Sequence, residues 1–516
     1  MDSQGAVIVR GRNRPGAARE SVEVCVIGSG AGGAVAAAEL AAGGRDVLLL
    51  EQGGHHTRDD FDQREDHLLP RLFEDGGMRT TDDGTVTILQ GRGVGGSTVH
   101  NLCYCFRAPQ PILKLWEREH DVRQLSSLQA SFERVERELE VKPILDEELN
   151  SLNRALRKGA VRLGYGHRIA QHNRSGCVRS GFCILGCAYD AKRSMLVTYV
   201  PKALRAGARI WADARADRIE RAGPGRWRVR ATLLDARARP VGNLRVEARV
   251  VVCSAGAIAT PVLLEASGLG ESSEERGRNL HLHPSVIASG IFPERLNAHY
   301  GIPQALYVDE FIDLERDPRS GYVLMPISGF PVLTATALPG FGAELYGYLR
   351  EFPRFGGLLA LLHDRSSGRV ARGQGGRPSI SYRLTPEDRV QLTAGLENVV
   401  RLLFASGAER VLVPYLDDPL LLEPHEGTAA IARRGVAEGI IPIVSTHPQS
   451  TCRMGGDPRR SVVGSFGEVH DARGVFVADM SVFPTSLGAP PQITTAALAD
   501  RTARHILERW GDLGSA

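Results

Sequence analysis

The chain has 516 residues, of which 42% are hydrophobic and 24% charged, a composition typical of a globular enzyme and unlike that of disordered, collagenous or coiled-coil proteins. Its 63 basic and 60 acidic residues give a formal net charge of +3, which provides no electrostatic case for a nucleic-acid partner. At roughly 100 to 200 residues per domain, the length predicts two to four structural units.

The first 20 residues are rich in Gly, Arg and Ser and lack the apolar core of about 7 to 15 residues that a secretory signal needs. We interpret residues 1–20 as a loose tail. No window reaches the ~18 to 20 apolar residues needed to span a bilayer, so we expect no transmembrane segment. These features together favour a cytoplasmic location.

A glycine-rich turn follows an apolar, β-branched run over residues 22–27 and precedes a helix-favouring stretch over residues 34–42. Gly28, Gly30 and Gly33 fit the dinucleotide-binding pattern. In that pattern the first glycine makes the turn, the second lets the backbone approach a pyrophosphate, and the third lets helix and strand pack closely. The sequence therefore predicts a dinucleotide site on a strand, turn and helix.

A second apolar strand over residues 47–50 ends at Glu51, 23 residues after Gly28. A carboxylate in this place can accept hydrogen bonds from ribose hydroxyls. The pattern does not choose between FAD and a nicotinamide cofactor.

Three later segments favour a flavin over a nicotinamide cofactor. A second glycine-rich stretch covers residues 91–101, an apolar strand with a small-residue turn covers residues 250–270, and a histidine-containing segment covers residues 447–455. In this order they resemble the motifs of the glucose-methanol-choline (GMC) oxidoreductases, a family of FAD enzymes. The resemblance extends over residues 21–105, 175–285 and 440–508 and implies further FAD-binding residues: Gly91, Gly95, Gly96, Ser97, Asn101, Asp479 and Gln492.

The resemblance also implies the fold. We expect an α/β protein in which an FAD-binding, Rossmann-like domain of the GMC type is interleaved with an α+β substrate domain built on a mainly antiparallel sheet. The FAD-binding domain is assigned to residues 21–110, 175–290 and 440–516. The substrate-binding cap is assigned to residues 111–174 and 291–439.

The C-terminal segment predicts a short buried strand over residues 474–479 and a helix over residues 492–508, with Pro490 and Pro491 just before its first turn. In relatives this helix start lies beside the pyrimidine end of the flavin, where reduction builds negative charge, so the resemblance implies the same role here. The alternative is a helix that only closes the sheet.

Oxidation of an alcohol removes a proton from oxygen and a hydride from carbon, and the N5 atom of a flavin can accept the hydride. A histidine suits the proton transfer because its ordinary pKa of ~6.5 leaves it neutral near pH 7. The resemblance implies that His447 is this catalytic residue. The family usually carries a second His or Asn before the last helix, but Pro490 stands there and has no polar side chain. His447 then works without a helper, a neighbour such as Gln492 or Asn101 replaces it, or the reaction differs.

Cys177, Cys183 and Cys187 place three thiols within eleven residues beside turn-forming glycines. Their spacing is similar to the three-iron cluster segment of bacterial FAD glucose dehydrogenases of the same family, so an iron–sulfur cluster is one interpretation. A packed loop without metal is equally favoured. A zinc site that uses His172 and a disulfide are weaker alternatives.

The favoured hypothesis is an FAD-dependent oxidoreductase that oxidises a bulky, apolar or sterol-like alcohol, with oxygen or an electron-acceptor protein receiving the electrons. A flavin-dependent elimination or desaturation in specialised metabolism is the second hypothesis, because Pro490 departs from the family pattern. A flavoprotein subunit that relays electrons is the third.

Overall fold

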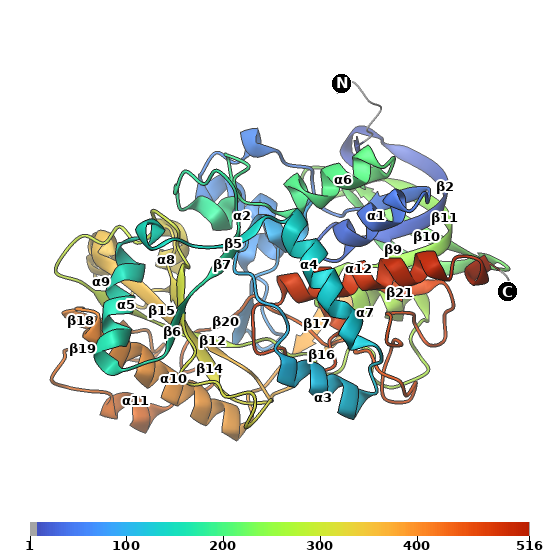
Figure 1. The fold of residues 1–516 in the computed structure, drawn as a ribbon. Helices are drawn as coiled ribbons and strands as arrows, with labels where there is room; N and C mark the ends of the chain where they lie inside the picture. Colours follow the sequence, from blue (N-terminus) through green and yellow to red (C-terminus); the bar gives the residue numbers. More distant parts are fainter. Residues whose placement is uncertain (1–7, 515–516) are drawn as a thin grey trace.

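The computed structural model describes residues 8–514, which form two large sheets with helices packed on their faces, and two further sheets of two strands each (Figure 1). The first sheet has the order β1-β8-β3-β2-β11-β10-β9, and β21 pairs with β11. Its core is parallel from β1 to β11, whereas β10 and β9 are antiparallel. The strands are β1 (Ile8–Arg10), β2 (Gly16–Ile27), β3 (Val47–Leu50), β8 (Arg209–Ala212), β9 (Ala214–Gly223), β10 (Arg226–Leu234), β11 (Pro240–Cys253) and β21 (Val475–Val477).

Helices from both ends of the chain cover this sheet. The first glycine turn leads into α1 (Gly33–Ala42), which is apolar on nearly all sides and buried because it packs against both α6 (Tyr199–Arg205) and α12 (Gln492–Glu508). Helix α12 also packs on α4 (Leu128–Glu138). The predicted helix over residues 492–508 and the strand over residues 47–50 are confirmed at these bounds. Further helices are α2 (Glu65–Leu72), α3 (Gln110–His120) and α7 (Gly256–Ser267), the last of which packs against β9.

The second sheet has the order β19-β18-β12-β15-β14-β13-β6, with β20 joined to both β12 and β4. All of its pairs are antiparallel except β20 with β4, so the expected mainly antiparallel sheet is confirmed. Its strands are β4 (Val86–Ile88), β6 (His167–Ile169), β12 (Ser285–Ile291), β13 (Leu306–Val308), β14 (Tyr322–Ile327), β15 (Phe355–Leu362), β18 (Arg410–Val413), β19 (Leu420–Leu422) and β20 (Ile443–Ser445).

The long helix α10 (Pro386–Ala405) packs across β12 and β15, and α5 (Ser151–Leu163) packs against α10. Their apolar side chains and the inner face of the second sheet form a core separate from that of the first sheet. Shorter elements complete the fold: β5 (Val141–Pro143) with β7 (Gln171–Asn173), β16 (Arg369–Arg372) with β17 (Pro378–Ser381), α8 (Pro331–Ala337), α9 (Ala343–Arg350) and α11 (Ala429–Arg434).

The expectation of a loose tail over residues 1–20 is wrong for residues 8–20, while residues 1–7 lie outside the described part of the chain. Strand β1 pairs with β8, and β2 begins at Gly16 in register with Gly242 of β11. The sequence looked loose because polar residues dominate it. Backbone pairing with the long strand β11 nevertheless holds it, and the guanidinium of Arg12 donates two hydrogen bonds, of 2.7 and 2.6 Å, to the buried carboxylate of Asp213.

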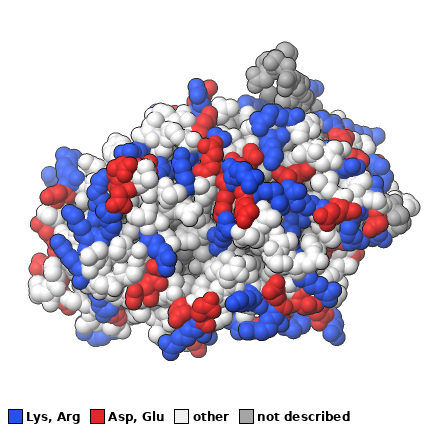
Figure 2. Space-filling model, in the orientation of Figure 1, with Lys and Arg blue, Asp and Glu red and all other residues white. Residues whose placement is uncertain are grey.

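On the face in Figure 2, positively and negatively charged side chains are interspersed, as expected for arginines that are paired with acids on a solvated surface. Arg209, for example, pairs with both Glu20 and Asp46. Within residues 8–514, no helix combines the length and the apolar character that crossing a membrane requires.

The Arg12 pair provides a test of the N-terminal segment. We expect Arg12→Ala to lower the free energy of unfolding by about 2 to 3 kcal/mol, because it leaves the carboxylate of Asp213 buried without its partner. Arg14→Ala is the matched control. Because Arg14 is exposed, its replacement should lower the free energy of unfolding by less than about 0.5 kcal/mol. Chemical denaturation measures both values, and equal stability of the two variants would contradict the role given to this segment.

Candidate active site

The first glycine turn is built so that only glycine fits at three of its positions, one of which is Gly32, where a Cβ would lie 1.6 Å from the carbonyl oxygen of Ala478. Gly28 has φ +97°, and a Cβ there would lie 2.2 Å from the carbonyl oxygen of Ser254. A Cβ on Gly33 would lie 1.8 Å from the carbonyl oxygen of Gly28. The turn thus brings β2, β11 and the start of α1 into direct backbone contact, as the dinucleotide pattern requires.

Gly30 differs, because the nearest atom to a Cβ built there is Cα of Gly96, at 3.9 Å. Its open side faces the second glycine-rich stretch. The amide of Gly95 donates to Oγ of Ser29 over 3.0 Å, so both glycine motifs meet at one serine. Such a cradle, open at Gly30 and next to the start of α1, fits the pyrophosphate of a dinucleotide.

Two of the predicted residues sit at the ends of this cradle. The carboxylate of Glu51, at the tip of β3, accepts hydrogen bonds from the amide (3.1 Å) and hydroxyl (2.7 Å) of Ser29 and from the amide of Gly53 (2.8 Å). Burial raises the pKa of Glu51, and these hydrogen bonds oppose the increase. Oγ of Ser97 accepts from the amide of Gly91 over 2.9 Å and so closes the second glycine loop.

Asn101 and Gln492 are brought together although 391 positions separate them: Nδ2 of Asn101 donates to Oε1 of Gln492 over 2.7 Å. Nε2 of Gln492 donates to the carbonyl oxygen of Tyr104 over 2.6 Å. The first residue of α12 is therefore fixed against the segment that follows the second glycine motif. The expected approach of the helix start to the cofactor stays a prediction.

Asp479 follows β21 and is buried. Its carboxylate accepts from the amide of Gly256 (2.9 Å), the hydroxyl of Thr260 (2.6 Å) and the amide of Ser481 (2.8 Å). Burial raises its pKa, and hydrogen bonds from Ser481 and Thr260 counteract this. Asp479 thereby connects the C-terminal segment to the start of α7. This helix begins shortly after β11, whose end contacts the first glycine turn.

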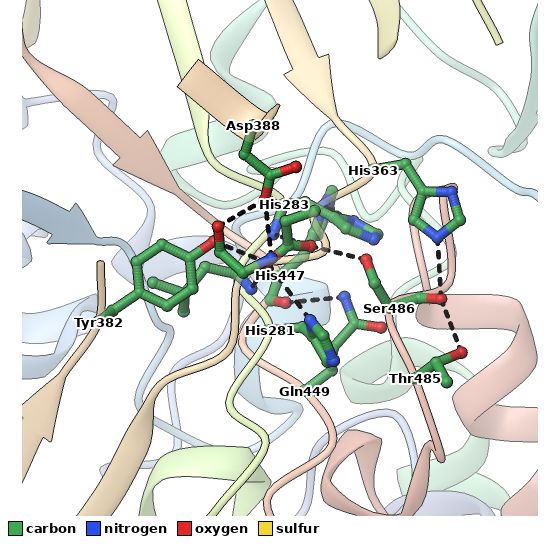
Figure 3. A network of polar contacts seen from close by, with 12 residues as sticks. His281, His283, His363, Tyr382, Asp388, His447, Gln449, Thr485 and Ser486 are labelled. Carbon is green, nitrogen blue, oxygen red and sulfur yellow. Dashed lines mark hydrogen bonds and ion pairs between the residues drawn. The ribbon is translucent and has the colours of Figure 1, made fainter. Parts of the chain in front are cut away.

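His447 lies in the loop after β20, in a cluster whose other histidines come from two further segments of the chain (Figure 3). Its Nδ1 is 3.2 Å from Nδ1 of His283, and the two rings are nearly perpendicular with centroids 5.3 Å apart. His363 is also close to His283, with ring centroids 6.4 Å apart, and its Nε2 lies 3.1 Å from the carbonyl oxygen of Ser486.

The carboxylate of Asp364 ties these segments together. It accepts hydrogen bonds from the amide of Leu282 (2.9 Å), the hydroxyl of Tyr382 (2.8 Å) and the hydroxyl of Ser486 (2.7 Å). Nδ1 of His281 lies 3.6 Å away. Burial alone would raise the pKa of Asp364, but His281 and the hydrogen-bond donors hold it well below its usual value. The cluster thus contains one fixed negative charge.

Burial disfavours the charged form of three of the histidines around this charge, His447, His363 and His283. Burial lowers the pKa of His447 to about 4, against an opposing effect of Asp364. Burial also lowers the pKa of His363 to about 4 and that of His283 well below its ordinary value. Nε2 of His447 has no hydrogen-bond partner among the described residues, and this atom is not fully buried. It remains accessible for a ligand.

A short segment joins this cluster to the cofactor cradle. The amide of Gly488 donates to Nε2 of His283 over 3.1 Å, and only four residues later Gln492 contacts Asn101. Four residues span at most about 14 Å. The backbone of Ser450 and Cys452 also pairs with Met480 and Ser481, next to Asp479. The histidine cluster and the glycine motifs therefore converge on one region.

For the cysteine loop, the sequence favoured an iron–sulfur cluster and a metal-free packed loop equally. No group of three or more His, Cys, Asp or Glu side chains within residues 8–514 is arranged to hold a metal ion, so the iron–sulfur interpretation of Cys177, Cys183 and Cys187 lacks structural support. All three are free thiols that line one cavity together with Cys103. Contact with Cys103, opposed by burial and aided by the charge of Lys192, lowers the pKa of Cys183 to about 7.

Sequence reasoning missed His281, His283, His363 and Asp364. The signals were present: a His-Leu-His run directly precedes β12, and His363-Asp364 directly follows β15. Polar residues at the ends of neighbouring strands tend to meet at one sheet edge, but the pairing of β12 with β15 was not known from sequence.

Comparisons with known proteins agree with the two-part architecture. Family models described as GMC oxidoreductase match residues 69–285 and 364–499, and one for an NAD(P)-binding Rossmann-like domain matches residues 26–71. The uncharacterized GMC-type oxidoreductase Rv0492c of Mycobacterium tuberculosis is 32% identical, over 92% of this chain and 74% of that protein.

The long-chain-alcohol oxidase FAO3 of Arabidopsis thaliana is 29% identical, over 94% of this chain and 67% of that protein. A solved structure of formate oxidase from Aspergillus oryzae RIB40, from work on FAD modification, is similar with a TM-score of 0.68. It covers 97% of this chain and 100% of its own, at 18% identity, and therefore supports the fold alone.

Gly30 and Gly33 both lie in the first turn, but we expect them to respond differently to substitution by alanine. We expect Gly33→Ala to lower the melting temperature and abolish FAD retention, since overpacking against backbone costs about 1 to 3 kcal/mol. Gly30→Ala should leave the melting temperature of the apoprotein within about 4 °C but weaken FAD binding at least about tenfold, because its methyl group enters the cradle. Thermal unfolding and FAD content after gel filtration measure both effects. Full FAD content in Gly30→Ala would contradict the cradle.

Proposed function

The chain belongs to the GMC oxidoreductase family and is an FAD-dependent oxidoreductase, and from this premise we propose that it oxidises the CH–OH group of an alcohol, with oxygen as the electron acceptor. Bound FAD would supply the two-electron acceptor, its N5 atom taking the hydride. The residues proposed to hold FAD are Gly28, Gly30, Gly33, Glu51, Gly91, Gly95, Gly96, Ser97, Asn101, Asp479 and Gln492.

The observation that carries this proposal is the position of His447. Its imidazole is neutral, is held through Nδ1 by His283, and keeps Nε2 accessible beside the segment that leads to Gln492. We propose that Nε2 binds the hydroxyl oxygen of the alcohol and controls the loss of its proton. A neutral histidine at a hydroxyl typically contributes a factor of about 10² to 10⁴ in rate.

A bulky, apolar alcohol is the proposed substrate class. The similarity to a long-chain-alcohol oxidase supports it, as does the buried segment 487–491, in which Leu487, Ala489 and two prolines offer few polar groups. Pro490 and Pro491 have no amide hydrogen to donate. A sugar bound beside them would leave neighbouring hydroxyls without partners, at a cost that an aliphatic chain avoids.

Replacing His447 tests the function. Anaerobic mixing of the wild-type holoenzyme with 1-dodecanol should bleach the flavin absorbance. We expect His447→Gln to slow this reduction by about 10² to 10⁴-fold, because the group at the hydroxyl oxygen is lost. FAD content should stay at the wild-type level, since His447 does not belong to the cradle.

The outcome separates the alternatives. An unreduced wild-type flavin with all alcohols would favour elimination or desaturation chemistry. Unchanged reduction in His447→Gln would contradict the role of this histidine.

The pKa of His447 predicts a pH dependence. The group faces His283 and the fixed negative charge of Asp364, and its pKa is about 4 because burial disfavours the imidazolium. Since the neutral imidazole is the active form, we expect the rate constant of flavin reduction to be flat between about pH 5.5 and 8 and to fall as the pH decreases through about 4. Stopped-flow pH jumps measure this. A midpoint near the ordinary histidine value of ~6.5 would contradict it.

A further inference from the structure

Four cysteines from two distant segments of the chain line one cavity. Cys177, Cys183 and Cys187 come from the loop before Lys192, and Cys103 comes from the segment that follows the second glycine motif. All four are free thiols. The side chains of Cys183 and Cys103 are in contact, although 80 positions separate them in the sequence. These two sulfurs are therefore placed to react with one another.

Cys183 carries the more reactive thiol of this pair. Contact with Cys103 lowers the pKa of Cys183 to about 7, with help from the charge of Lys192 and against the effect of burial. The same contact raises the pKa of Cys103, which is almost fully buried, whereas Cys183 is partly exposed. The proton of the pair thus stays on Cys103 and the negative charge on Cys183. Because the thiolate is the nucleophile in cysteine chemistry, Cys183 is the attacking sulfur.

Lys192 connects the pair to a residue that is proposed to hold FAD. Its buried ammonium group donates to the carbonyl oxygens of Cys183 (2.6 Å) and Asn101 (2.9 Å). Oδ1 of Asn101 accepts from the amide of Cys103 over 3.2 Å, and Nδ2 of Asn101 donates to Gln492. Cys103 has a φ of +68°, a left-handed backbone that few residues other than glycine adopt. A new covalent bond at Cys103 therefore acts on the backbone that positions Asn101.

We propose that Cys183 and Cys103 are a peroxide-reactive pair of thiols, which closes into a reversible disulfide and weakens the contacts by which Asn101 is proposed to hold FAD. Hydrogen peroxide forms when oxygen takes two electrons and two protons, so the inference rests on the proposed function for the source of its oxidant. Peroxide released by the enzyme would then lower the affinity of the enzyme for its own cofactor.

The oxidation balances in two steps. Sγ of Cys183 attacks one oxygen of the peroxide: an S–O bond forms, the O–O bond breaks, and the hydroxide that leaves takes up the proton that Cys183 has released. Sγ of Cys103 then attacks the sulfenic acid at Cys183: the S–S bond forms, the S–O bond breaks, and the oxygen leaves as water with the proton of Cys103. The pair of thiols loses two electrons, and one peroxide gives two molecules of water.

Peptide mapping of the holoenzyme after treatment with hydrogen peroxide tests the pair. We expect a disulfide between Cys103 and Cys183 and the loss of two of the eight thiols of the chain, both reversed by dithiothreitol. Cys187→Ser is the matched control. It removes another thiol of the same cavity and should form this disulfide to the same extent as the wild type.

Two single variants test which sulfur attacks the peroxide. In Cys103→Ser the sulfenic acid at Cys183 has lost its reaction partner, so we expect dimedone, which traps sulfenic acids, to label Cys183 at least about tenfold more than in the wild type. Cys183→Ser should show neither the disulfide nor a labelled Cys103. Strong labelling of Cys103 in Cys183→Ser would contradict the assigned order.

The FAD content of the holoenzyme after gel filtration measures the effect on Asn101. We expect peroxide to lower the FAD content of the wild type at least about threefold, because a weaker site loses FAD during the separation. Reduction with dithiothreitol in the presence of added FAD should restore it. The same peroxide treatment should leave the FAD content of Cys183→Ser unchanged, since this variant cannot form the disulfide.

Several outcomes would overturn the proposal. These are the absence of a disulfide, a disulfide of Cys183 with Cys177 or Cys187, and iron or zinc bound at these cysteines, which metal analysis of the same sample detects. Unchanged FAD content in the oxidised wild type would overturn the effect on Asn101. None of these measurements uses an alcohol, so a failure of the proposed substrate class leaves their result intact. If a variant does not fold, peptide mapping of the wild type decides the pair.

Discussion

The buried carboxylate of Asp364 is the interaction on which the arrangement of the histidine cluster depends. It receives hydrogen bonds from the backbone just before β12, from Tyr382 and from Ser486, so three segments that are distant in sequence meet at one charge. A buried carboxylate is stable only when such donors surround it. The same donors fix the backbone that carries His283 and, through Ser486, the approach to Gly488.

The two large sheets contribute different parts of the proposed active site. The glycine turns of the parallel sheet form the cradle proposed for FAD, and the close contacts at Gly28 and Gly33 leave little freedom there. The antiparallel sheet contributes the strand ends that carry His283 and Asp364. The segment 488–492 connects the two. A change in the packing of either sheet therefore reaches the other through a short, proline-stiffened stretch of chain.

The parts of the fold that depend on local pattern could be predicted from the sequence. The strand, turn and helix around Gly28, the end of β3 at Glu51 and the bounds of α12 follow from glycine spacing, apolar periodicity and the prolines before the helix. The antiparallel second sheet came from the family resemblance. Asn101 meets Gln492, and the FAD-binding roles that the resemblance implied for both residues stay predictions.

The histidine cluster could not be predicted in the same way, because it depends on which strands are neighbours. His283 and Asp364 are 81 positions apart and meet only because β12 pairs with β15. The N-terminal segment was missed because its residues are mostly polar, and it is held by backbone pairing and by ion pairs with residues far along the chain, such as Arg12 with Asp213. The cysteine pattern was misleading for a related reason. Cys177, Cys183 and Cys187 lie close together in the sequence, but Cys183 contacts Cys103, which comes from another segment.

The placement of β21 and α12 has a consequence for biosynthesis. Strand β21 pairs with β11, and α12 packs against α1, which the chain forms more than 400 residues earlier. The half of the protein that contains the first sheet therefore lacks one strand and the covering helix until residues 475–508 have left the ribosome. Its exposed apolar surface must be protected during that interval, and the last steps of folding are expected to follow translation.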